Sequence, residues 1–286
     1  MIMRQKSYLF NKLKENSQNY SKSHKVLARF ILKDYQKVAF TTIQQFAELS
    51  GISEPTIIRF VRVLGFKGYP AFLKEIRRIV RIDLKGNERF KIAADFRDNN
   101  FNPITKIISK EIENLSYLKE IFNEKDFKET ILTIKRAKDI LIVGTRSTSY
   151  LTLHFWFGLT KLEMKAERIM SISTETYDYI NKLDRNALII VIGFPRYLRE
   201  LIDILNFSKN KGIKSITITD SPLSPLRGDI NLYTPAESIS FMAFHCAPLV
   251  LINAIVNELS LLDKEHTSKA LNRFEILAEN RKYFFE

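Results

Sequence analysis

The pattern of apolar and polar positions divides the chain into two regions with different periods. Between residues 22 and 80, apolar side chains recur every three or four positions in four short segments, which predicts a tight series of helices. From residue 140 onward, the short apolar runs 140–144, 187–193 and 215–220 alternate with amphipathic stretches. This alternation predicts an α/β fold whose parallel sheet is covered by helices on both faces.

Local capping signals position the four N-terminal helices. Ser23 is the expected N-cap of the first helix. The second helix is predicted over 42–49 and ends at Gly51, because glycine readily adopts the left-handed conformation that closes a helix. The third begins at Ser53, and the fourth is predicted over about 70–81.

These elements suggest a helical domain over residues 1–80 and an α/β domain over 105–286. The intervening segment 81–104 lacks a clean period and is predicted to be a linker. Within the second domain, 241–262 is predicted to be a helix that is apolar nearly all round. Such a helix suits a position buried on several sides or across a subunit interface.

The net charge of +13 is concentrated in the helical region. Residues 1–82 contain 16 basic and 5 acidic side chains, a net +11, whereas the remaining residues contain 29 and 27, a net +2. A strongly basic N-terminal region, residues 1–82, in a chain that is otherwise nearly neutral indicates that this region binds a polyanionic partner.

Composition also limits the cellular setting. Cys246 is the only cysteine, so neither an intrachain disulfide nor a cysteine-built metal site is possible, which favours a reducing compartment. The N-terminus is too charged for a signal peptide. The uncharged stretch 238–257 contains His245, Pro248 and Asn253, so it fits a core or interface helix better than a membrane span. We expect a cytoplasmic protein with no membrane partner.

Residues 41–65 have the order of a helix-turn-helix motif: a short helix, a glycine turn and a second helix. In the second helix, the apolar side chains of residues 57, 60, 61 and 64 form one inward stripe. Arg59 and Arg62 then lie on the opposite face.

This face suits double-stranded DNA. Arg59 is placed to read a guanine, and Thr56 or Ile58 to touch a thymine methyl group. Arg62 and the two nearby lysines are expected to contact phosphates. The candidate DNA-binding residues are Ser53, Glu54, Thr56, Ile58, Arg59, Arg62, Lys67 and Lys74. The alternative is an ordinary helical bundle with a solvated basic face.

The run from Ala47 to Gly68, with its Ser-Glu-Pro-Thr, Arg-Phe and Leu-Gly-Phe-Lys-Gly-Tyr segments, resembles the helix-turn-helix domain of RpiR-type bacterial transcriptional regulators. The resemblance covers nearly the whole chain, because these regulators carry a C-terminal SIS (sugar isomerase) domain of α/β type. It implies a homodimer or homotetramer that binds a palindromic operator and responds to a phosphosugar.

The resemblance also implies two ligand-binding turns. The first usually reads G-x-G-x-S. Here Gly144 matches, Arg146 replaces the second glycine and Thr148 replaces the serine. Small residues let the backbone approach an anion, and a hydroxyl caps the following helix beside it. Ser147 and Ser149 belong to the same candidate turn.

The second turn usually reads S-x-S-G-x-T-x-E, and this sequence departs from it. Gly193 and Pro195 replace the serines, Arg196 replaces the glycine and Leu198 replaces the threonine, so that only Glu200 matches. Three hydroxyls are lost, and proline also removes a backbone N–H donor. A phosphate cannot be held here in the family's usual way.

Arg146 and Arg196 occupy equivalent places in the two turns and could replace the lost hydroxyls, since guanidinium groups bind carboxylate and phosphate as planar forks. One hypothesis is an effector site for an acidic metabolite. The other is that the arginines pair with Glu175, Asp220 or Glu237 in a scaffold without ligand. The candidate effector-binding residues are Gly144, Arg146, Ser147, Thr148, Ser149, Gly193, Arg196, Tyr197 and Ser224, although Ser224 also fits a purely structural turn.

No signal for catalysis, a metal or a cofactor is present in the sequence. The four histidines are isolated from one another, and neither a phosphate-binding GxxxxGK[ST] loop nor an HExxH string occurs. We therefore predict a DNA-binding regulator that is not an enzyme. The alternative is a sugar-phosphate isomerase or sugar-phosphate binding protein, in which the positive charge of residues 1–82 has no role in function.

Overall fold

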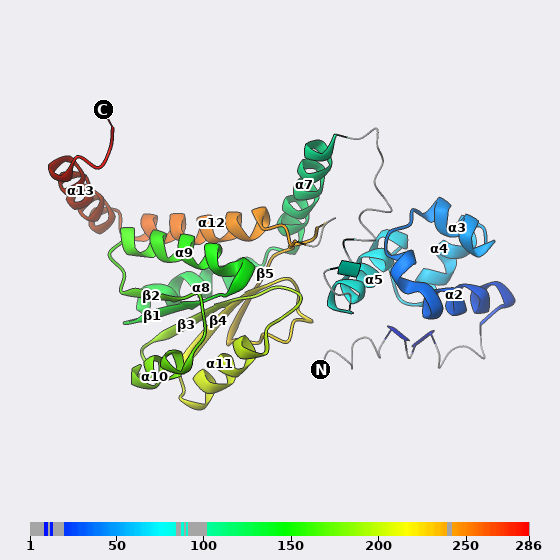
Figure 1. Ribbon diagram of the computed structural model, residues 1–286, viewed down its shortest axis with the longest axis horizontal. Coiled ribbons are helices and arrows are strands. Elements are labelled where there is room, and N and C mark those ends of the chain that lie inside the picture. The colour runs from blue at the N-terminus through cyan, green and yellow to red at the C-terminus, as the bar shows by residue number, and fades with distance from the viewer. Residues whose placement is uncertain are drawn as a thin grey trace. The chain divides into compact units, whose positions relative to one another are not determined.

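The computed structural model describes residues 9, 10, 12, 13, 20–83, 87, 88, 90, 102–238 and 242–285. The chain divides into two compact units, residues 1–99 and 100–286. The first is helical, and the second contains a sheet flanked by helices (Figure 1). Most of the segment 81–104, predicted to be a linker, lies outside the described residues, but residues 81–83 and 103–104 at its two ends are helical.

The first unit contains the four helices that the sequence predicts. They are α2 (Lys22–Val38), α3 (Ile43–Ser50), α4 (Glu54–Val63) and α5 (Tyr69–Asp83). The expected N-cap of the first helix was wrong: Ser21 is the cap, and its Oγ accepts a hydrogen bond from the backbone N–H of His24 at 3.3 Å. Ser23 instead lies inside the first turn.

A single apolar core holds these four helices together. Each contributes completely buried side chains at helical spacing, so the unit is stabilised by amphipathic faces packed on one another. The fully buried members include Leu27, Ile31, Phe46, Ile57, Phe60, Phe72 and Ile76. Gly51 ends α3 with a φ of +68°, a left-handed conformation that suits glycine and sets the direction of α4.

The second unit is built on a five-stranded parallel sheet with the order β2-β1-β3-β4-β5. The strands are β1 (Ile140–Val143), β2 (Ala166–Ile169), β3 (Leu188–Ile192), β4 (Lys214–Thr219) and β5 (Ile230–Tyr233). The sequence prediction recovered β1, β3 and β4 but missed β2 and β5. Both missed strands lie at the edges of the sheet and are only partly buried, so they lack a continuous apolar run.

Helices cover both faces of this sheet, which confirms the predicted fold class. One face packs against α8 (Glu124–Arg136), α9 (Ser149–Lys161) and α12 (Cys246–Leu262), and Leu118 of α7 (Pro103–Ile121) joins the same core. The other face packs against α10 (Thr174–Lys182) and α11 (Arg199–Asn210) (Figure 1). Helix α13 (Lys264–Arg281) follows α12.

Helix α12 is shorter than the sequence predicts. It begins at Cys246, and residues 242–245 are not helical, while the start of the predicted helix lies outside the described residues. Within this chain only one side of α12 is buried, and Val250, Leu261 and Leu262 are exposed on its surface. Across the described residues, no single helix has the length and apolarity to cross a bilayer; α12 and α13 satisfy those criteria only as a pair bent by 106°.

The start of α3 provides a test of how this fold is stabilised. Thr42 Oγ1 accepts a hydrogen bond from the N–H of Gln45 at 3.2 Å, and Gln45 Oε1 accepts one from the N–H of Thr42 at 2.9 Å. Thr42→Ala should lower the free energy of unfolding by about 1 kcal/mol, because it removes one half of this capping box. Urea unfolding followed by circular dichroism measures the loss. Thr42→Ser keeps the hydroxyl and should be nearly neutral; equal losses in both variants would contradict the capping role.

Candidate functional site

The outward face of α4 carries a small polar network. Arg59 is exposed; its Nε donates to the carbonyl oxygen of Pro55 at 3.3 Å and its Nη2 to Thr56 Oγ1 at 3.4 Å. Ser53 Oγ lies 3.0 Å from Thr56 Oγ1. These contacts hold the guanidinium beside the leading end of the helix, which is the part of a recognition helix that faces bases in the major groove.

The other predicted DNA-binding residues surround this network within the first unit. Ile58 and Glu54 are half-buried on α4, whereas Arg62 is exposed near its end. Lys67 is exposed in the loop after α4, and Lys74 is half-buried on α5. The inward stripe of α4 is completely buried at Ile57, Phe60 and Val61, which leaves the polar face free as the sequence predicts.

In the second unit, the turn after β1 packs tightly against the end of β3. A Cβ atom on Gly144 would lie 2.3 Å from Thr152 Oγ1 and 3.3 Å from the carbonyl oxygen of Ile192. Thr148 Oγ1 donates to the carbonyl oxygens of Thr145 at 2.9 Å and of Ile192 at 3.2 Å. Glycine is therefore required at position 144, and the Thr148 hydroxyl joins the two turns.

Arg146 adopts a left-handed backbone conformation with φ of +56°. This explains why glycine is usual at the matching position of the G-x-G-x-S pattern, since glycine adopts this conformation without strain. For arginine the conformation costs about 1 kcal/mol. The guanidinium of this turn is therefore carried by a strained backbone position.

The turn after β3 offers few backbone donors. The N–H of Gly193 donates to the carbonyl oxygen of Ile218 at 3.1 Å, and Pro195 has no N–H. Leu198, the N-cap of α11, makes no side-chain capping bond. The hydroxyl cradle of the usual pattern is absent, as the sequence predicts.

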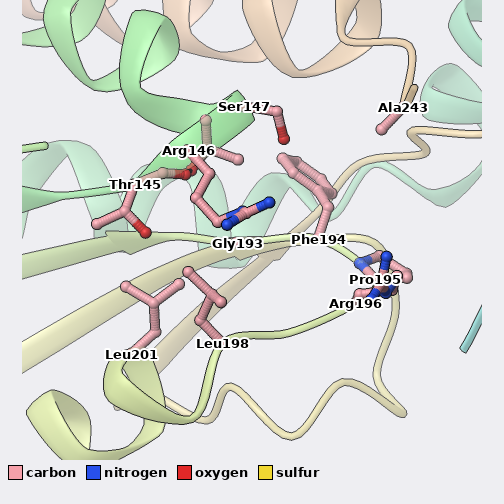
Figure 2. A pocket seen from close by; sticks show the side chains of 11 residues that line it. Thr145, Arg146, Ser147, Gly193, Phe194, Pro195, Arg196, Leu198, Leu201 and Ala243 are labelled. Atoms are coloured by element: carbon pink, nitrogen blue, oxygen red, sulfur yellow. The ribbon is translucent and has the colours of Figure 1, made fainter. Parts of the chain in front are cut away.

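A cavity of about 300 Å³ lies between the two turns. In Figure 2 the Arg146 side chain extends toward Gly193 and Phe194, and Arg196 lies on the far side of Phe194. Five of the nine predicted effector residues line this cavity: Arg146, Ser147, Thr148, Gly193 and Arg196. The other lining residues are not among those predicted from the sequence: Thr145, Phe194, Pro195, Leu198, Leu201 and Ala243.

The remaining predicted residues support the site rather than line the cavity. Ser149 Oγ donates to the carbonyl oxygen of Arg146 at 2.8 Å, and the hydroxyl of Tyr197 donates to Asp220 Oδ1. Ser224 is completely buried; its Oγ accepts from Thr219 Oγ1 at 2.8 Å and from the N–H of Leu226 at 3.1 Å. Ser224 therefore stabilises its own turn, which is the structural alternative to a role in effector binding.

The structure does not show the ion pairs of the ligand-free alternative. Glu237 pairs with Lys110 at 3.1 Å, and Asp220 accepts from Tyr197. A hydrogen bond from Ser173 is the largest cause that lowers the pKa of Glu175. Within the described part of the chain, Arg146 and Arg196 form no ion pair and remain available to an anion.

A buried histidine beside the cavity was missed in the sequence, where the histidines were interpreted as isolated. His245 Nδ1 is hydrogen-bonded to the hydroxyl of Tyr150, and its ring lies 5.2 Å from that of Phe194. Burial lowers the pKa of His245 to about 4, with Glu111 opposing the shift, and burial is the largest cause that raises the pKa of Tyr150 to about 12. Tyr150 and Phe194 contact His245 in the fold but are distant from it in the sequence. No local motif therefore predicts these contacts of His245.

The described residues contain no group of three or more histidine, cysteine or acidic side chains placed to hold a metal ion. The two turns each place one arginine side chain at the lining of the first cavity.

Comparison with known proteins supports both domains. Residues 7–78 match the helix-turn-helix domain of the rpiR family, and residues 133–258 match the SIS domain. The fold and these matches define a helix-turn-helix transcriptional regulator with a SIS domain. The chain belongs to the RpiR-type regulators, as its N-terminal motif predicts.

Individual relatives agree with this family. HexR, an HTH-type transcriptional regulator of Pseudomonas aeruginosa, is 23% identical over 250 residues, which cover 80% of this chain and 83% of HexR. The sugar isomerase domain of an RpiR transcription factor from Sphaerobacter thermophilus is 18% identical, with a TM-score of 0.59, and covers 60% of this chain and 98% of that one. The NanR protein of Vibrio vulnificus, complexed with ManNAc-6P, is 20% identical with a TM-score of 0.58, and the match covers 95% of this chain and 98% of NanR.

The buried His245 predicts a specific pH dependence. Its pKa is about 4 in the folded protein and 6.5 when unperturbed, so the unfolded state takes up a proton first as the pH falls. The stability from this histidine is complete above pH 6.5 and is lost as the pH falls toward 4, by up to about 3 kcal/mol. Urea unfolding between these pH values should show a shallower dependence for His245→Gln than for wild type. The exposed His154→Gln should keep the wild-type slope; an unchanged slope in His245→Gln would contradict the assignment.

Proposed function

We propose that this regulator binds operator DNA through α4 and that an anionic metabolite, held between the two arginine-bearing turns of its SIS domain, controls that binding. The single observation that carries the effector assignment is the pair of unpartnered arginines lining one cavity between strand ends. In open α/β sheets, ligands bind at such carboxyl ends of strands where the strand order reverses.

The DNA assignment rests on the polar face of α4 and the charge around it. Arg59, Arg62 and Lys67 are all exposed, and the contacts of Arg59 hold it beside the start of α4. In the proposed complex Arg59 contacts a base edge, and Arg62 and Lys67 contact phosphates. Residues 1–82 carry a net +11, which favours a polyanion over a neutral partner. A regulator that binds operator DNA would act in the bacterial cytoplasm, because the DNA is located there.

The effector assignment rests on charge and on the loss of hydroxyls. The described residues lining the cavity include two arginines and no acid. Guanidinium groups bind phosphate and carboxylate with similar geometry, so both kinds of acid suit the site. A sugar phosphate is bound to NanR, which shares the fold, and this makes phosphosugars natural first candidates.

A symmetric homo-oligomer fits this mechanism. In a two-fold dimer, two copies of α4 would read the two halves of a palindromic operator about one DNA turn apart. Exposed apolar side chains on α9 and α12, such as Phe157 and Val250, offer a surface for a second copy. A ligand that weakens DNA binding must itself bind more weakly to the DNA complex, because coupling is reciprocal.

DNA selected by the purified protein from random duplexes tests the first part. Arg59→Ala should weaken binding to the selected duplex by about 1–3 kcal/mol and relax its sequence preference. Lys67→Ala should weaken binding to all duplexes alike and reduce the slope of log K against log salt by about one per copy bound. The exposed Arg136→Ala, in the second unit, serves as the control and should change neither quantity. If DNA binding did not depend on salt concentration, the alternative of a sugar-phosphate isomerase or sugar-phosphate binding protein would be favoured instead.

A melting screen with phosphosugars and small carboxylic acids tests the second part. A true ligand raises the midpoint by mass action, and at a hundred times its Kd it adds about 2.7 kcal/mol to stability. Arg196→Ala should abolish this shift and leave the midpoint of the free protein nearly unchanged, since its side chain has no partner to lose. The Arg136→Ala protein should respond like wild type. A shift of equal size in Arg196→Ala would remove the arginine from the site.

A further inference from the structure

Of the four helices of the first unit described above, α2 carries the most positive charge, although it is not the predicted recognition helix. Its 17 residues contain five basic side chains and one acid, a net +4. The ten residues of α4 contain Arg59, Arg62 and Glu54, a net +1. The charge of this unit is therefore not concentrated on the helix that is proposed to read bases.

The basic side chains of α2 share the face that points away from the core. Leu27, Ala28 and Ile31 are buried on one side of the helix. At about 100° per residue, positions 22, 25, 29 and 33 fall on the opposite side. All five basic residues are exposed except for the half-buried Lys25. In Figure 1, α2 lies along one edge of the first unit. These side chains form the basic face of α2: Lys22, Lys25, Arg29, Lys33 and Lys37.

No described residue neutralises the basic face of α2. Within the described part of the chain, none of its five side chains forms an ion pair. Asp34, the single acid of the helix, lies where the backbone leaves the helical conformation, with φ of −141° and ψ of 39°. Helices of the second unit differ, because Glu124 pairs with Lys128 and Glu265 with Lys269, both at 2.6 Å and four residues apart.

This arrangement of charges does not stabilise α2. Arg29, Lys33 and Lys37 follow one another at intervals of four residues, where like charges repel. Lys22 begins the helix, whose first turn contains no acid, and the helix dipole disfavours positive charge there. A surface optimised for stability would mix both signs. Like charges that are kept together against these costs indicate a polyanionic partner.

The basic face of α2 suits the phosphates of duplex DNA better than an anionic membrane. A helix that binds a membrane inserts its apolar side chains into the lipid, but the apolar side of α2 is buried in the core of its own unit. Along α2, Val26 is the one large apolar side chain that is exposed. From residue 22 to residue 37 the helix rises about 22 Å, which is about the axial length of six base pairs.

The basic face of α2 begins beside the polar face of α4. The ring of His24 lies 5.0 Å from that of Phe60, which belongs to α4. Burial, followed by the charge of Arg59, lowers the pKa of His24, so the guanidinium also lies near the start of α2. A duplex that Arg59 contacts is therefore adjacent to the first turn of α2. The DNA next to the bases read by α4 is then the nearest polyanion for the rest of the face.

We propose that the basic face of α2 is a second DNA surface, which contacts the phosphates of the duplex flanking the bases read by α4 and reads no sequence itself. Such contacts add affinity and extend the length of bound DNA by about six base pairs for each copy of the protein. This inference rests on the proposed DNA binding by α4 and adds to it a surface outside the helix-turn-helix motif.

Fluorescence anisotropy of the full chain with two duplexes tests the proposal. The short duplex contains only the base pairs that sequence selection enriches, and the long one adds about one helical turn of DNA at each end. Wild type should bind the long duplex more tightly. A triple variant with Arg29→Gln, Lys33→Gln and Lys37→Gln should lose this advantage. Its slope of log K against log salt on the long duplex should fall by up to about three for each copy bound. Its preference for the selected sequence should remain, because phosphate contacts carry no sequence information.

A matched control removes the same charge from exposed positions of the second unit. It combines Lys125→Gln, Lys135→Gln and Arg136→Gln on α8, and it should behave like wild type on both duplexes. Equal weakening on the short and long duplexes, or an equal loss in the control, would assign the effect to overall charge and overturn the proposal. An unchanged salt slope in the α2 variant would also overturn it, while leaving the role of α4 intact. If wild type does not prefer the selected duplexes to random DNA, the proposed DNA function itself fails.

Urea unfolding of the free proteins gives a readout that needs no DNA. Glutamine has a helix propensity close to that of lysine and arginine, so the triple variant keeps α2 helical. Because the three side chains repel one another, this variant should unfold at the same or a higher urea concentration than wild type, with the larger gain at low salt. A clearly lower midpoint would show that the charges stabilise the fold and would overturn the functional explanation for them.

Discussion

The proposed effector site depends on how closely the turn after β1 packs against the end of β3. Position 144 has no room for a Cβ atom, and Thr148 Oγ1 bridges from its own turn to the carbonyl oxygen of Ile192. These contacts follow from the parallel pairing of β1 with β3, which brings two strand-to-helix turns to the same sheet edge. Once the turns are fixed in this way, the positions of Arg146 and Arg196 around one cavity follow.

Around this cavity the chain accepts several local costs. Arg146 has a left-handed backbone, the hydroxyl of Thr145 is unpartnered, and His245 is buried with Nε2 lacking a partner among the described residues. Elsewhere in the second unit, polar groups such as Ser224 and Thr219 satisfy one another inside the fold. Unpaired polar groups and left-handed residues also occur away from this cavity, at Thr130, Thr234 and Glu163, so the charge of the two arginines rather than strain alone distinguishes the cavity.

The helix-turn-helix unit reaches its arrangement in a different way. There, one amphipathic helix separates the two tasks by face: Ile57, Phe60 and Val61 are buried completely, while Arg59 is held outward by Pro55 and Thr56. No strain is needed, since a helix presents both faces at a fixed period. The proposed DNA-contacting surface of the first unit is therefore regular structure, whereas the proposed effector site of the second lies in irregular turns at the ends of regular strands.

This difference explains what the sequence by itself determined. It predicted the four N-terminal helices, the three central strands, the domain types and the two arginine-bearing turns, because these depend on periodicity and local turn chemistry. It missed β2 and β5, whose partial burial interrupts the apolar pattern, and it misjudged the start of α12. Only the tertiary structure decided that Thr145 lines the cavity, that Tyr150 and Phe194 meet His245, and that the acids near the arginines are engaged elsewhere. Those facts depend on contacts between residues far apart in the chain, which no local pattern of residues encodes.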